Sequence, residues 1–223
     1  MRSAEYVFGA GEGEIARLVN SAVRRRPPAE QLLDRLGDLR SCVVLDAGCG
    51  PLGVLDLLTQ RFDLVHERLV LVSLAQAPRA VAETVRVTRP GGWVALQEFD
   101  HVSLLCQPPH PAWDTLMAAW DRVRDDAGMD VTVGRRLHGL LRDAGLVDIG
   151  IDVHASVGPP GAAGRVLPLY VAELHHDRIV SLGALTANEI DAAVAELTAH
   201  LADPGTSVVN PMLFQAWGRR PVR

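Results

Sequence analysis

The residues best suited to chemistry lie in one short segment, Asp46-Ala-Gly-Cys-Gly-Pro-Leu-Gly53. The apolar run before it, Cys42-Val-Val-Leu-Asp46, is typical of a buried parallel strand. Glycines after such a strand let the backbone approach a ligand, and the helix expected over residues 54–60 points free N–H groups at the same place. The spacing therefore favours a nucleotide-type ligand, although the same glycine pattern also occurs at nicotinamide and flavin sites and in turns that bind nothing.

Histidines supply the second group of candidates. His101 and His110 follow the strand expected over residues 93–98, at the end where open α/β sheets bind ligands. Histidine is the usual general base near neutral pH, and His101 is the better placed of the two, with an exposed loop histidine as the alternative. His175 and His176 lie beside Asp177, but no third ligand has suitable spacing, so we expect a surface pair and no metal.

The elements that would position these residues alternate between strand and helix, which predicts an α/β fold with a mainly parallel sheet. Apolar β-branched runs predict strands over residues 42–46, 62–66, 93–98, 147–154 and 214–217. Helical spacing predicts helices over residues 12–25, 30–39, 77–88, 113–127, 134–144, 167–182 and 188–201, the last opened by the capping pattern Thr186-Ala-Asn-Glu189.

Several blocks resemble class I S-adenosylmethionine-dependent methyltransferases of the small-molecule type. Val44-Leu-Asp-Ala-Gly-Cys-Gly50 looks like the first motif, residues 61–71 like the fourth strand, and residues 86–98 (R-V-T-R-P-G-G-W-V-A-L-Q-E) like the turn and fifth strand. Residues 214–220 resemble the antiparallel last strand, and residues 6–9 and 14–18 resemble the lid helix. The resemblance implies a Rossmann-like core over residues 41–157 and 205–223, a helical lid over residues 1–40 and a helical insertion over residues 158–204.

The resemblance implies S-adenosylmethionine as cofactor, S-adenosylhomocysteine as product, and methyl transfer to oxygen, nitrogen or carbon of a small apolar or aromatic metabolite. Two other readings stay open, a non-methylating reaction such as a cyclisation and a degenerate fold that acts as an interaction partner. His101 is the catalytic candidate, and no metal is implied. The cofactor-binding residues it implies are Tyr6, Arg17, Asp46, Gly48, Cys49, Gly50, Gly53, His66, Glu67 and Arg68.

The chain departs from the family between Gly53 and Phe62. Family members carry two more strands there, the first ending in the acid that binds the cofactor's ribose, over roughly fifty residues with their crossovers. Either a segment has been lost from the printed chain, or a natural deletion leaves a degenerate site, or Phe62–His66 is itself the second strand and Glu67 the ribose-binding acid. The first explanation is favoured because a sheet without those strands would expose an apolar edge.

Composition restricts the function classes further. The 223 residues include 22 basic and 27 acidic residues, and a net charge of −5 argues against binding nucleic acid by phosphate neutralisation. No apolar run is long enough to span a membrane, and the first residues do not look like a secretory signal. Three cysteines cannot form a disulfide framework, so a cytoplasmic location is expected. The apolar residues of segment 158–204 predict an acceptor pocket or a homodimer face.

Overall fold

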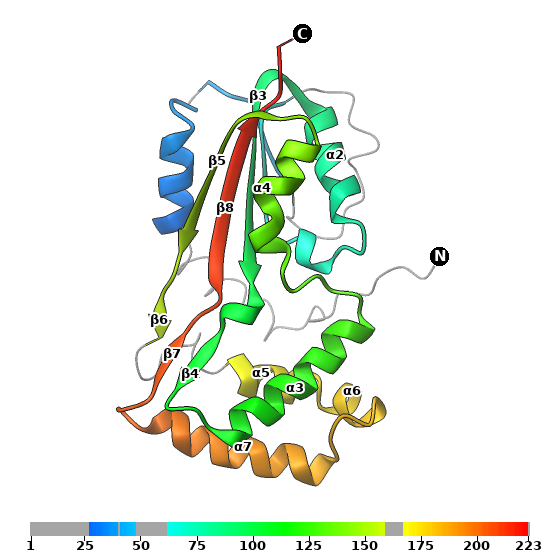
Figure 1. Cartoon of the computed structure of the whole chain (residues 1–223), viewed down its shortest axis with the longest axis vertical. Helices are drawn as coiled ribbons and strands as arrows, with labels where there is room; N and C mark the ends of the chain where they lie inside the picture. The colour runs from blue at the N-terminus through cyan, green and yellow to red at the C-terminus, as the bar shows by residue number, and fades with distance from the viewer. Residues whose placement is uncertain (1–26, 40, 48–61, 159–166, 223) are drawn as a thin grey trace. The chain divides into compact units, whose positions relative to one another are not determined.

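The computed structural model describes residues 27–39, 41–47, 62–158 and 167–222 (Figure 1). The chain divides into two compact units, which are described separately. The first unit comprises residues 1–99, Thr132–His154 and Leu213–Arg223, and the second comprises Asp100–Val131 and Ala155–Met212.

A five-stranded sheet forms the centre of the first unit. In spatial order its strands are β1 (Val44–Ala47), β2 (Phe62–Arg68), β3 (Thr88–Asp100), β8 (Met212–Arg219) and β5 (Val147–His154). β1 and β2 pair in parallel, as do β2 and β3, whereas β5 and β8 are antiparallel. The predicted α/β fold, with a mainly parallel sheet and an antiparallel last strand, is therefore confirmed.

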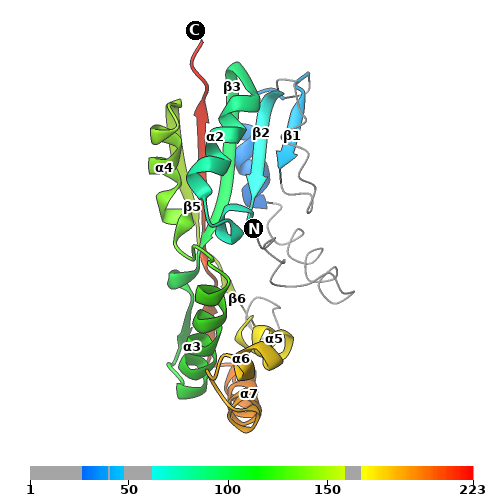
Figure 2. The same ribbon diagram turned by 90° about the vertical axis from the view of Figure 1, so that its right-hand side faces the viewer.

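Helices cover both faces of this sheet (Figure 2). Residues 27–35 are helical on one face, where Leu32 and Leu36 pack against Leu64 of β2 and Ala95 of β3. On the other face lie α2 (Ala77–Val87) and α4 (Val133–Asp143). On this second face Val65 is part of a separate buried cluster. It points away from Leu64 because successive residues of a strand point to opposite faces.

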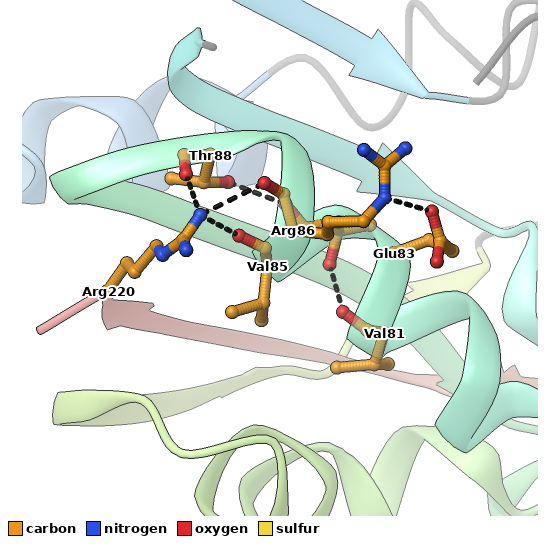
Figure 3. A network of polar contacts seen from close by, with 7 residues as sticks. Val81, Glu83, Val85, Arg86, Thr88 and Arg220 are labelled. Atoms are coloured by element: carbon orange, nitrogen blue, oxygen red, sulfur yellow. Dashed lines mark hydrogen bonds and ion pairs between the residues drawn. The ribbon is translucent and has the colours of Figure 1, made fainter. Parts of the chain in front are cut away.

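The turn from α2 into β3 is fastened by the C-terminal segment (Figure 3). The guanidinium Nη1 of Arg220 donates hydrogen bonds to the carbonyl oxygens of Val85, Arg86 and Thr88, at 3.0, 2.9 and 2.6 Å. Carbonyls at the end of a helix have no partner within the helix, and a cation there also complements the helix dipole. Arg220 thus caps the carboxyl end of α2.

The Pro-Gly-Gly sequence allows this turn to form. Gly91 has a φ of 77°, a conformation that side chains disfavour, and its N–H donates to the carbonyl of Arg220. A Cβ on Gly92 would lie 2.8 Å from Thr88 Cγ2 and 2.9 Å from the carbonyl oxygen of Asp63. Close backbone packing, rather than ligand binding, accounts for both glycines.

The second unit is built mainly from α3 (Pro111–Asp126), α5 (Leu167–Leu174), α6 (His176–Ser181) and α7 (Ala187–Ala202). α3 packs against the other three helices. The short 3-10 helix η3 (His101–Ser103) belongs to the same unit. A small antiparallel sheet completes it, in the order β4 (Leu105–Gln107), β7 (Ser207–Val209) and β6 (Val157–Gly158).

The second unit differs in two respects from the predicted insertion over residues 158–204. It also includes residues 100–131, because α3 supplies the apolar face on which α5, α6 and α7 pack. The helix predicted over residues 167–182 is two helices separated at His175, whose ring stacks on Trp120 with centroids 4.7 Å apart. The capping box of Thr186 and Glu189 that opens α7 is confirmed.

The strand order bears on the connection between β1 and β2. In a doubly wound sheet of order 3-2-1-4-5-6, the third strand is at an edge, whereas the fifth has neighbours on both sides. β3 has β2 on one side and β8 on the other. This arrangement favours β2 and β3 as the fourth and fifth strands of the family, so the alternative that Phe62–His66 is the second strand is not supported. Among the described strands β1 is at the edge; Val43, just before it, and Val44, its first residue, are 45% and 46% exposed.

Candidate functional site

The carboxyl ends of β1 and β2 bring Asp46 and His66 together. These residues are direct partners in the parallel register of the two strands. Nδ1 of His66 lies 2.8 Å from Oδ1 of Asp46, and Nε2 lies 3.1 Å from Oε1 of Gln97 on β3. The His66 side chain is only 15% exposed, but that of Asp46 is 66% exposed. The histidine is thus held on two sides while the carboxylate faces solvent.

The contact with His66 sets the charge of Asp46. Its hydrogen bond lowers the pKa of Asp46, partial burial opposes the shift, and the nearby charges of His66 and Arg68 lower the pKa further. Asp46 is consequently a carboxylate at neutral pH. An exposed carboxylate at the carboxyl end of a parallel strand suits a ligand that carries an ammonium group.

A chain of polar side chains extends from this pair across the sheet. Gln97 on β3 donates through Nε2 to Oε1 of Gln215 on β8, at 2.5 Å, and both glutamines are fully buried. Asp46, His66, Gln97 and Gln215 thus link four neighbouring strands. Sequence reasoning did not single out the two glutamines. The sequence feature that could have indicated them is a polar residue within an apolar strand, because a buried polar side chain needs a hydrogen-bond partner.

The prediction that Glu67 contacts a cofactor does not fit its geometry. Glu67 is 2% exposed, and its Oε1 accepts hydrogen bonds from the backbone N–H groups of Val70 at 2.5 Å and Leu71 at 3.3 Å. His66 and Glu67 point to opposite faces of β2 because they are consecutive in the strand. Since His66 faces Asp46, Glu67 turns into the core beside α2 and η2 (Leu71–Ser73).

Arg68 and His101, two other predicted site residues, lie within the described part of the chain. Arg68 ends β2 and is half-buried, and its charge acts on Asp46. His101 begins η3 in the second unit, where its backbone N–H donates to the carbonyl oxygen of Val131 at 2.9 Å. The remaining predicted site residues lie outside the described part of the chain: Tyr6, Arg17, Gly48, Cys49, Gly50 and Gly53.

The other histidines have structural surroundings. Nδ1 of His110 accepts a hydrogen bond from the N–H of Ala112 and so caps α3, and its ring lies 4.5 Å from that of His200. His176 pairs with Asp177 at 3.2 Å. Within the described ranges no group of three or more His, Cys, Asp or Glu side chains could hold a metal ion.

Within the same ranges, no helix has the length and apolar character needed to cross a membrane.

Comparisons with known proteins show similarity to methyltransferases over part of the chain. Residues 8–96 match the model of a methyltransferase domain family, a segment that includes β1, β2 and most of β3. This match agrees with the resemblance to the class I S-adenosylmethionine-dependent methyltransferases over the matched segment, which is less than half of the chain.

Two curated relatives are similar in sequence over about half of the chain. The N-methyltransferase tcpN of Claviceps purpurea is 36% identical over 111 residues, which cover 47% of this chain and 37% of tcpN. An uncharacterized methyltransferase of Schizosaccharomyces pombe, C1B3.06c, is 37% identical over 119 residues, covering 53% of this chain and 42% of that protein. The matched part thus spans less than half the length of either relative.

Among solved structures, an O-methyltransferase family protein from Burkholderia thailandensis is similar, with 15% identity and a TM-score of 0.45. The comparison covers 68% of this chain and 61% of that one.

Proposed function

We propose that this chain binds S-adenosylmethionine at the carboxyl ends of β1 and β2 and transfers its methyl group to a nitrogen atom of a small molecule. The observation that carries the proposal is the methyltransferase domain match, which spans the strands that present Asp46 and His66. Two curated relatives with names that specify nitrogen, tcpN and the N-methyltransferase sirN of Leptosphaeria maculans, support the acceptor atom.

The described residues fit the amino acid end of this cofactor. The exposed carboxylate of Asp46 is a partner for its ammonium group, and His66 keeps that carboxylate ionised and oriented. We assign Gly48, Cys49, Gly50 and Gly53 to the backbone that approaches the cofactor, and Tyr6, Arg17 and Arg68 to further contacts. Glu67 is left out because its carboxyl group is committed to backbone N–H groups.

When bound, the cofactor supplies a methyl group that is already activated by the positive sulfur. The protein then has to align the acceptor and exclude water from it. His101 is the proposed general base, which would accept the proton that a nitrogen nucleophile releases. The acceptor itself is proposed to be a small molecule, because the resemblance is to methyltransferases of the small-molecule type.

The proposal is tested by methyl transfer to matched acceptors. The chain is incubated with S-adenosylmethionine and pairs of small aromatic compounds that differ only in an amine or a hydroxyl group. Mass spectrometry of the products should find methylated amines, together with S-adenosylhomocysteine. Methylation confined to hydroxyl groups would overturn the acceptor assignment. Cofactor binding without any methylated product would instead favour a non-methylating reaction, and the absence of binding would favour an interaction protein.

A further inference from the structure

Two buried glutamates meet next to the site, in the first unit. Glu67 near the end of β2 is 2% exposed, and Glu98 near the end of β3 is fully buried. The two carboxyl groups converge on the backbone N–H of Leu71, from which one oxygen of each glutamate accepts a hydrogen bond. Among the described residues, neither Oε2 atom has a hydrogen-bond partner. A proton on one of the two carboxyl groups supplies a donor and avoids two buried like charges side by side.

The other oxygen of each glutamate holds the chain that follows β2. Oε1 of Glu67 accepts from the N–H of Val70 at 2.5 Å and from that of Leu71 at 3.3 Å. Oε1 of Glu98 accepts from the N–H of Leu71 at 2.5 Å and from that of Val72 at 3.3 Å. The two carboxyl groups together engage three consecutive backbone donors at the start of η2.

The turn held in this way is strained. Leu69 has a φ of 59°, in the left-handed region that branched side chains rarely adopt, and its N–H donates to the carbonyl of Gln97. Such a conformation persists only where the surrounding contacts enforce it, and strain of this kind is concentrated at functional sites. The turn directly follows His66 and Arg68, whose charges act on Asp46.

The surroundings favour retention of the proton. Burial raises the pKa of both glutamates, most strongly that of Glu98, while hydrogen bonds from the backbone and the charge of His66 act in the opposite direction. The elements packed around the pair carry these other ionisable side chains: Asp63 and Arg68 on β2, Arg89 and Asp100 on β3, Arg79, Glu83 and Arg86 on α2, and Arg135, Arg136, His138, Arg142 and Asp143 on α4. Those of α4 and Arg79, Arg86 and Arg89 are exposed.

We propose that Glu67 and Glu98 act as one proton-sharing clamp, which positions the turn over residues 68–70 and with it the site edge that begins at His66. Both are positioning residues, and the shared proton keeps the clamp closed. Loss of the proton leaves two buried like charges in contact, which opens the turn. The link to cofactor binding rests on the proposed function, whereas the clamp itself does not.

The pH dependence of stability tests the clamp. A glutamate in the unfolded chain loses its proton near pH 4.5, whereas the folded pair retains one proton to higher pH. The stability from this proton is complete below 4.5 and is lost as pH rises through the folded pKa. In that window the unfolding constant of the wild type should rise about tenfold per pH unit relative to Glu98→Gln, whose neutral amide takes the place of a protonated carboxyl group at every pH. Glu67→Gln should behave in the same way, and the exposed Glu196→Gln is the control.

Two further measurements address positioning. Amide hydrogen exchange at Val70, Leu71 and Val72 should lose protection at high pH in the wild type but not in Glu98→Gln. The affinity for S-adenosylmethionine should weaken over the same pH range in the wild type alone. Parallel stability curves for wild type and variants, or failure of both glutamine variants to fold, would overturn the clamp. If the wild type binds no cofactor at any pH, the proposed function fails while the stability and exchange measurements still decide on the clamp.

Discussion

At the scale of single residues, close packing in the first unit depends on a glycine in β5. A Cβ at Gly150 would lie 2.3 Å from Cζ2 of Trp217 on the neighbouring strand β8. Trp217 also packs on the helix over residues 27–35, where the guanidinium of Arg35 lies 5.4 Å from its ring centroid. A methyl group at this position would therefore disturb both the sheet and the helix on that face.

We expect Gly150→Ala to lower the free energy of unfolding by roughly 1–3 kcal/mol, because the indole has to move. The matched control is Gly139→Ala in α4, where an added Cβ meets nothing within 4 Å. That change should be neutral or stabilise by up to about 1 kcal/mol, since alanine is the better helix former. Urea unfolding of both variants makes the comparison, and equal effects would contradict the packing argument.

The second unit contains a buried charge at Arg124. This residue is 4% exposed and its Nη2 pairs with Asp121, while its Nε and Nη1 have no hydrogen-bond partner in the part of the chain that the structure describes. Its guanidinium carbon lies 5.6 Å from the centroid of the Trp120 ring. Burial lowers the pKa of Arg124 to about 10.

Replacement of Arg124 by methionine should leave stability at pH 7 unchanged or raise it by up to roughly 2 kcal/mol, since donors without partners are costly in the interior. The folded pKa is lowered, so the folded protein releases this proton before the unfolded chain does. The cost of burial is therefore relieved as pH rises through about 10, and the advantage of the variant should shrink there. Unfolding curves at pH 7 and pH 10 test this, with the exposed Arg122→Met as control. A large loss of stability at pH 7 would contradict the account.

The sequence predicted the site residues unevenly. Asp46 and His66 were predicted as site residues at the ends of short apolar strands, and the register of β1 and β2 brings them together, while their role in binding stays a prediction. Glu67 lies on the opposite face of β2 from His66, in the core, because side chains alternate along a strand. Gln97 and Gln215 could not be paired from the sequence, since their contact joins residues that are 118 positions apart.

At the scale of elements, the C-terminal segment fixes α2 to the start of β3 through Arg220. We expect Arg220→Ala to destabilise the protein by about 1–2 kcal/mol, because three carbonyls lose a charged donor. The control Arg219→Ala removes the neighbouring guanidinium, which lies 4.6 Å from the ring centroid of Trp93. A smaller loss is expected there, since exposed cation–π contacts contribute only about 0.5–1 kcal/mol. Thermal unfolding that ranks the two variants in reverse would count against the cap.

Elements with strong local signals were predicted well. The helices α2, α4 and α7 begin and end within a residue or two of the predicted limits, because periodicity and capping residues mark them. β4, β6 and β7 escaped prediction because strands of two or three residues show no period. The interruption at His175 escaped as well, since it reflects a tertiary contact with Trp120 rather than a local helix breaker.

At the scale of the whole molecule, the connection between β1 and β2 decides what the chain can bind. The order β1-β2-β3-β8-β5 gives β3 two neighbours, which agrees with the fourth and fifth strands of a methyltransferase sheet. The two family strands expected before them have no counterpart in the sequence between Gly53 and Phe62. The acid expected to hold the cofactor's ribose would be absent with them, so the proposed function assigns most of the affinity to Asp46 and the glycine segment.

The central claim is that this chain binds the methyltransferase cofactor through Asp46, and calorimetric titration tests it most directly. The wild-type chain should bind S-adenosylmethionine and S-adenosylhomocysteine with dissociation constants on the order of micromolar. Asp46→Asn should weaken both by about tenfold or more, while the exposed Asp191→Asn should bind like the wild type. A folded, monodisperse wild-type sample that binds neither compound would contradict the claim.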